Sequence, residues 1–157
     1  TNNSERGLAN KPGVDAPNPR ANNAMGQIIR WREDGDFDGL SMVWNHLLLA
    51  GDPANERPEA KGNIQGDVFA CPDGIRFGPN GLLWIQTDAH ATQMHQGELA
   101  RMGNNQMLAA DIKTGEIRRF LTGPSGCEIT GVVTTPDGRT MFVNIQHPGE
   151  TIRRRTN

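Results

Sequence analysis

Residues 71–87 read CPDGIRFGPNGLLWIQT, and residues 127–145 read CEITGVVTTPDGRTMFVNI. Both stretches place an acidic residue soon after a cysteine, and then continue with the pattern Gly-x4-Pro-x-Gly and an apolar run. The matching glycines, Gly74 and Gly131, are 57 residues apart. β-branched and aromatic residues around a turn rich in Pro and Gly are typical of a β-hairpin. Because self-similarity at a fixed spacing identifies an architecture, this repeat decides the fold.

Two further hairpins are expected outside the repeated stretches. Residues 27–32 and 40–44 flank a polar turn with Asp-Gly chemistry, and residues 106–121 contain two apolar runs around a Lys-Thr-Gly turn. No segment has a helical period, which predicts an all-β fold. Since the 106–121 hairpin lies between the two repeats, the repeating unit holds four antiparallel strands, as a propeller blade does.

The sequence therefore predicts a partial β-propeller of about two to three four-stranded antiparallel blades. Propellers close their ring with about 4–8 blades, so the 157 residues would need strands from a missing part of the protein, or self-association. A plain β-sandwich with coincidental turns is the alternative architecture.

The charge and hydropathy of the chain exclude two classes of partner. The formal net charge is −2, which lacks the basic excess of a nucleic-acid-binding protein. No uninterrupted apolar window of about 18 residues occurs, so no membrane-spanning helix is expected. We therefore expect neither a nucleic acid nor a membrane among the partners.

Asp73 and Glu128 are the expected metal ligands. Each lies just before the first strand of a repeat unit, where the innermost strand of a blade would border the central axis. Glu128 stands between Cys127 and Ile129, a context in which a buried carboxylate is costly unless it is paired or coordinated. The alternative for Asp73 is an ordinary Asp-Gly turn. Converging carboxylates are typical ligands of hard cations.

Other polar residues offer binding chemistry with less specific patterns. His147 ends a strand expected to approach the channel, where it could face an anionic ligand, and Arg20 could clamp an anion such as phosphate bidentately. An exposed loop arginine is the alternative for Arg20. Calcium-binding oxygens are offered, without EF-hand spacing, by Asp88, Asn104 and Asn105.

Cys71 and Cys127 occupy equivalent positions in the two repeats. Two buried free thiols are the favoured interpretation. A disulfide between them and a thiolate ligand to iron are the alternatives.

Ordered blocks of sequence across about residues 1–150 resemble the C-terminal part of PhoX-type alkaline phosphatases. The resemblance does not extend to residues 151–157, which we interpret as a tail. The blocks are TNN (1–3), NPRAxN (18–23), GQIIRW (26–31), AGDP (50–53), LWIQTD (83–88), GNNQM (103–107), GCEITG (126–131) and FVNIQHPGE (142–150).

The resemblance implies a bacterial phosphatase exported in folded form by the twin-arginine route to the periplasm or the extracellular space. It implies a six-bladed propeller whose central channel holds a cluster of iron and calcium that binds and hydrolyses phosphate monoesters. Family members carry Arg-Pro-Glu-Trp shortly before the Thr-Asn-Asn block, whereas this sequence starts at Thr1. The N-terminal half, with further metal ligands, is also missing, so the chain alone is expected to be inactive.

Two other functions stay open at this point. One is a noncatalytic propeller module that binds calcium or a protein partner. The other is a lactonase-like propeller hydrolase that depends on a single calcium.

Overall fold

The computed structural model describes residues 5–149, so the tail predicted at 151–157 lies outside the described residues. Within this range the chain forms strands and two short 3₁₀ helices, and no α-helix. The elements are β1 (Gln27–Glu33), β2 (Met42–Leu49), η1 (Pro58–Ala60), β3 (Gln65–Gly66), β4 (Pro72–Phe77), β5 (Leu83–Thr87), η2 (Gly97–Leu99), β6 (Gln106–Ala110), β7 (Glu116–Thr122), β8 (Glu128–Thr134) and β9 (Met141–Gln146).

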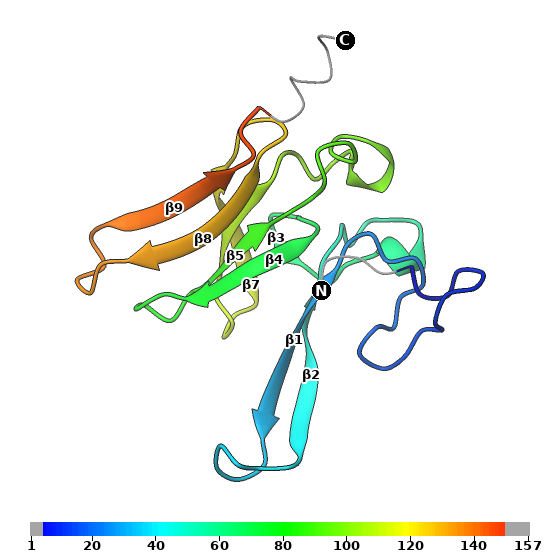
Figure 1. The fold of residues 1–157 in the computed structure, drawn as a ribbon, viewed down its shortest axis with the longest axis horizontal. Coiled ribbons are helices and arrows are strands. Elements are labelled where there is room, and N and C mark those ends of the chain that lie inside the picture. Colours follow the sequence, from blue (N-terminus) through cyan, green and yellow to red (C-terminus); the bar gives the residue numbers. More distant parts are fainter. Residues whose placement is uncertain (1–4, 150–157) are drawn as a thin grey trace.

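The strands form one five-stranded sheet and two separate hairpins. The large sheet has the order β3-β7-β6-β5-β4, in which β4 to β7 are antiparallel and β3 runs parallel to β7. The hairpins are β1–β2 and β8–β9. Figure 1 shows the β8–β9 hairpin beside the large sheet, with β8 nearer to it, whereas β1–β2 projects away from the other strands. The prediction of an all-β chain built from four hairpins is confirmed.

The sequence repeat corresponds to a repeated irregularity in the strand ladders. The β4–β5 register shifts between Pro72 and Ile75, around Gly74. The β8–β9 register shifts between Thr130 and Val132, around Gly131. A Cβ at Gly74 would overlap the side chain of Gln86, and Gly131 has a φ of +57°, so both bulges favour glycine.

The strand β5 is buried on both of its faces and separates two apolar clusters. Leu83 and Ile85 face the larger cluster, which extends to Ile28 and Leu48 at the base of the β1–β2 hairpin. Trp84 faces the smaller cluster, in which side chains of the large sheet meet those of β8. The buried members of that cluster are Trp84, Met107, Cys127, Ile129 and Val132. This second cluster therefore fixes the β8–β9 hairpin against the sheet.

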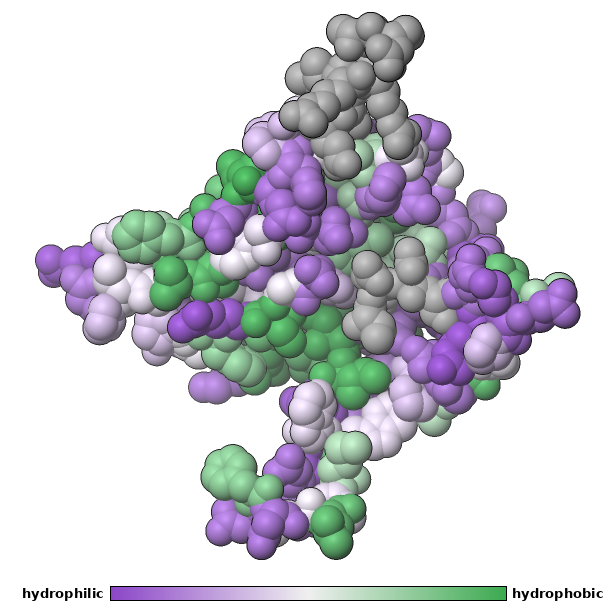
Figure 2. Space-filling view, viewed as in Figure 1, coloured by the Kyte–Doolittle hydropathy of each residue, from purple (hydrophilic) through white to green (hydrophobic). Residues whose placement is uncertain are grey.

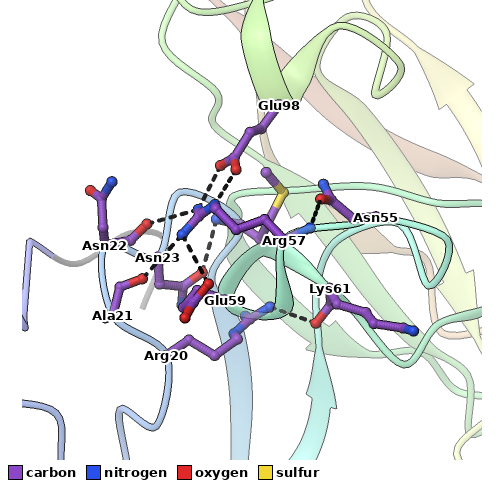
Figure 3. A network of polar contacts seen from close by, with 10 residues as sticks. Arg20, Ala21, Asn22, Asn23, Asn55, Arg57, Glu59, Lys61 and Glu98 are labelled. Atoms are coloured by element: carbon purple, nitrogen blue, oxygen red, sulfur yellow. Dashed lines mark hydrogen bonds and ion pairs between the residues drawn. The ribbon is translucent and has the colours of Figure 1, made fainter.

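The segment before β1 has little regular structure and is held by arginines (Figure 3). Arg20 is only 6% exposed, and its guanidinium donates to the carbonyls of Ala50 at 2.8 Å, Lys61 at 3.2 Å and Gly26. Burial, with a smaller contribution from the charge of Arg57, lowers the pKa of Arg20 to about 10. Arg20 thus joins the N-terminal segment to the chain around β2.

Arg57 makes a second connection to the same segment. Its guanidinium pairs with both carboxylate oxygens of Glu98, and donates to the carbonyls of Ala21 at 3.4 Å and Asn22 at 3.1 Å (Figure 3). The hydrogen bonds to Glu98 raise the pKa of Arg57 above its usual value. The planar fork of arginine suits this arrangement, because it reaches a carboxylate and two carbonyls at once.

The β1–β2 hairpin exposes several large apolar side chains to solvent. They are Trp31, Phe37, Leu40, Met42 and Val43. Figure 2 shows hydrophobic surface on this hairpin and on the sheet beside it. A two-stranded hairpin alone is marginally stable in water, so this surface is typical of one that packs against further structure. No helix within residues 5–149 is long and apolar enough to cross a membrane.

We expect the two cysteines to react slowly in the folded protein. Both are free thiols, 2% and 1% exposed for Cys71 and Cys127. Burial, together with the charge of Asp88, raises the pKa of the Cys71 thiol from 9.0 to about 11, which lowers its thiolate fraction at pH 8 about 100-fold. Alkylation with iodoacetamide at pH 8, quantified by mass spectrometry with and without denaturant, checks this. A disulfide-linked peptide, or equal labelling in both conditions, would contradict it.

We expect Arg57→Lys to loosen the N-terminal segment, because lysine cannot reproduce the forked contacts. The free energy of local opening should fall by about 1–2 kcal/mol, which corresponds to amide exchange about 5- to 30-fold faster in residues 5–26. Hydrogen–deuterium exchange measures it. The control is Arg118→Lys, whose ion pair with Glu116 is exposed and should be worth less than about 1 kcal/mol. Equal effects of the two variants would refute the role of Arg57.

Candidate functional site

Three carboxylates meet where the β4–β5 and β8–β9 hairpins adjoin. They are Asp73, Asp88 and Glu128, and one ligand oxygen from each lies within 4.8 Å of the others. Asp73 is exposed, while Asp88 and Glu128 are partly buried. Such a spacing allows one cation to contact all three side chains.

The strand pairing explains why residues far apart in sequence converge here. Asp73 lies at the start of β4, and Asp88 directly follows β5, the antiparallel neighbour of β4. The N–H of Asp88 donates to the carbonyl of Cys71 at 3.0 Å, which holds the two strand ends together. Glu128 opens β8, and packing of β8 on β5 places it beside them.

The site concentrates negative charge. Burial raises the pKa of the Glu128 carboxyl, and the charges of Asp88 and Asp73 raise it further, while His147 offsets part of this effect. No salt bridge to Asp73 or Glu128 is found within the described part of the chain. Like charges this close disfavour joint ionisation unless a cation neutralises them.

A pocket of about 230 Å³ opens beside two of the carboxylates. It is lined by Asp88, Ala89, His90, Ala91, Asn105, Cys127, Glu128 and His147. His147 directly follows β9 and adopts a left-handed φ of +52°, and Cys71, before β4, has a φ of +54°. Such backbone conformations are costly for non-glycine residues and cluster at functional sites.

The structure brings together most of the residues that the sequence singled out. Asp73 and Glu128 lie in one group, and His147 lines the adjoining pocket. Arg20 does not line it, and its guanidinium is engaged with backbone carbonyls. Asn104 bonds instead to His95 and the carbonyl of Gly123.

Sequence reasoning missed that Asp88 shares a site with Asp73 and Glu128, and grouped it instead with Asn104 and Asn105 as calcium-binding oxygens. A signal was available, because Asp88 follows the strand that pairs antiparallel with the one beginning near Asp73. The sequence contained no comparable signal for the buried hydrogen bonds of the Asn105 side chain, which is 1% exposed.

The donor set determines which chemistry the site can support. Three carboxylates supply only hard oxygen ligands, which suit calcium and also iron, and His147 and His90 add imidazoles at the pocket. The arrangement therefore fits the binding of a hard cation.

Comparisons with known proteins identify the family of the chain. The family model of alkaline phosphatase PhoX matches residues 1–149. The solved structure of Pseudomonas fluorescens PhoX, in complex with vanadate, a transition state analogue, is 47% identical in sequence with a TM-score of 0.86. The match covers 96% of this chain and 26% of that one. Among curated proteins, none matches.

The chain thus spans about a quarter of the length of the solved relative, at an identity that shows common ancestry as well as a common fold. The family match extends over all the elements from β1 to β9, including the three carboxylates. The chain belongs to the alkaline phosphatase PhoX family.

Proposed function

We propose that the protein takes part in metal-dependent hydrolysis of phosphate monoesters, with Asp73, Asp88 and Glu128 as carboxylate ligands. One observation carries the proposal: three carboxylate groups lie within 4.8 Å of one another in a chain 47% identical to a PhoX that binds a transition state analogue. Since the chain covers 26% of that relative, the activity is proposed for the full-length protein and not for these residues alone.

The residues present fit the calcium and iron that the family resemblance implies. An all-oxygen set of carboxylates is the arrangement that calcium prefers, and the pKa of Glu128 is raised by burial and by the neighbouring charges of Asp88 and Asp73. A bound cation would act as a Lewis acid that neutralises charge on the phosphoryl oxygens. The protein's own contribution is to hold the carboxylates together and to shape the pocket beside them.

We propose that His147 faces the substrate. It lines the same pocket as Asp88 and Glu128, where an imidazole N–H would donate a hydrogen bond to a phosphate oxygen. Arg20, the other predicted substrate contact, is not included, because its guanidinium already donates to three backbone carbonyls.

We further propose that the strands form part of a ring of blades. In this interpretation β4–β7 is a complete four-stranded blade, β8–β9 is the inner half of the next and β1–β2 is the outer half of the preceding one. An apolar hollow of about 220 Å³, lined by residues including Trp31, Leu47 and Phe77, lies between β1–β2 and the sheet. Inner strands of the preceding blade would fill this hollow.

The missing strands are proposed to come from the rest of a longer polypeptide, with self-association as the alternative. The twin-arginine export route and a periplasmic or extracellular location are proposed on the family resemblance alone.

We expect a chelator to abolish phosphatase activity in the full-length protein. Hydrolysis of p-nitrophenyl phosphate should fall at least about 100-fold with excess EDTA and recover when calcium and iron are restored, because the phosphoryl charge is then neutralised again. A noncatalytic module would show no turnover in either state. Calcium-dependent lactone hydrolysis without phosphatase activity would favour the lactonase-like alternative.

We expect Glu128→Gln to lower metal content and phosphatase rate together, the rate by about 100-fold. The metal-free variant should be at least as stable as the metal-free parent, because the change removes a repelled charge. Metal analysis, rate measurement and chemical denaturation check these outcomes. The control is Glu116→Gln, which alters only an exposed ion pair. A variant that loses stability but keeps its metal would show Glu128 to be a packing residue.

A further inference from the structure

We propose that Asn105 is a positioning residue that holds Asp88 and Glu128 at the separation a shared cation requires. The inference rests on the proposed function, because it assigns a role toward the same carboxylates. Asn105 directly precedes β6, whereas Asp88 follows β5 and Glu128 opens β8. Its side chain bonds to the neighbours of both acidic residues in the chain.

The hydrogen bonds of Asn105 connect two separate segments. Its Oδ1 accepts from the N–H of Ala89 at 2.7 Å and from the hydroxyl of Thr87 at 3.0 Å, so it contacts the residues on both sides of Asp88. Its Nδ2 donates to the carbonyls of Ala89 at 2.9 Å and Cys127 at 2.9 Å. Cys127 immediately precedes Glu128.

These four bonds use the full capacity of the amide, which has two donors and two acceptor lone pairs. Asn105 is 1% exposed, so a lost bond would leave a buried polar atom without water to replace the partner. The N–H of Gln106 donates to Thr87 Oγ1 at 2.9 Å, which leaves the hydroxyl proton of Thr87 for Asn105. With its oxygen already engaged, Asn105 acts through its neighbours and not as a ligand.

The strand ladders do not provide this connection. β5 belongs to the five-stranded sheet and β8 to the β8–β9 hairpin, with no ladder between them. Apolar packing holds the two together, but it is not directional and tolerates small shifts. A cation bound by several carboxylates requires defined oxygen positions. The Asn105 amide supplies a directional link between the two strand ends.

The test measures calcium affinity in the full-length protein after its metals are removed, with calcium alone as the probe in competition with a chromophoric chelator. We expect Asn105→Ala to weaken calcium binding about 10- to 100-fold, as loss of an outer contact to metal ligands does. Once iron is also restored, excess calcium should recover most of the phosphatase rate. A residue that only stabilises the fold would not show this rescue.

The matched control is Asn23→Ala. Asn23 is 3% exposed and makes three comparable hydrogen bonds, to the N–H groups of Met25 and Gly26 and to Gln27, outside the pocket. It should lower the unfolding temperature comparably and leave calcium affinity within about twofold of the parent.

If the alanine variant does not fold, calcium affinity is measured instead in the Asn105→Asp variant. It keeps the shape and the acceptor oxygen, but turns a carboxylate toward the carbonyls of Ala89 and Cys127. We expect weaker calcium binding despite the added negative charge, and a gain in affinity would overturn the proposal.

The outcomes separate this inference from the proposed function. If Glu128→Gln and Asp88→Asn weaken calcium binding while Asn105→Ala does not, only the positioning role fails. If none of the three variants changes calcium affinity, the proposed metal site fails with it.

Discussion

The packing of β8 against β5 is the interaction on which the site depends. Asp73 and Asp88 are neighbours through the β4–β5 ladder, whereas β8 brings Glu128 beside them, because Ile129 and Val132 share an apolar cluster with Trp84 and Met107. The same apolar contact that stabilises the fold therefore assembles the three carboxylates. It also keeps Glu128 partly buried, which raises its pKa and strengthens the demand for a counter-charge.

Packing and hydrogen bonding make different contributions to the site. Burial of apolar surface supplies most of the free energy but little directionality. Directionality comes from a few polar contacts, such as the N–H of Asp88 with the carbonyl of Cys71 and the Asn105 amide with the carbonyl of Cys127. The left-handed backbone of Cys71 and His147 is a further costly conformation, found at residues close in the chain to the site.

Sequence reasoning was most successful where the signal is local. The four hairpins follow from alternating residues around Pro- and Gly-rich turns, and the repeat placed Asp73 and Glu128 at matching positions. The two-residue strand β3 had no such signal, because its pairing with β7 joins distant residues in parallel. The burial of Arg20 could not be predicted from the sequence either. The carbonyls that accept its hydrogen bonds belong to Gly26, Ala50 and Lys61, and two of these residues are far from Arg20 in the chain.

The separation of β1–β2 and β8–β9 from the central sheet has a consequence for the order of strand pairing and ion binding. Within residues 5–149, β1 and β9 each have an edge without a strand neighbour, and such edges recruit whatever strand is available. When the strands that pair with these edges lie far away along the polypeptide, their pairing is slow and occurs late in folding. Because Asp73 and Glu128 belong to different hairpins, the ion proposed to bind them could be held tightly only after those hairpins have docked. Binding of the ion would then stabilise only the molecules in which the two hairpins are correctly docked.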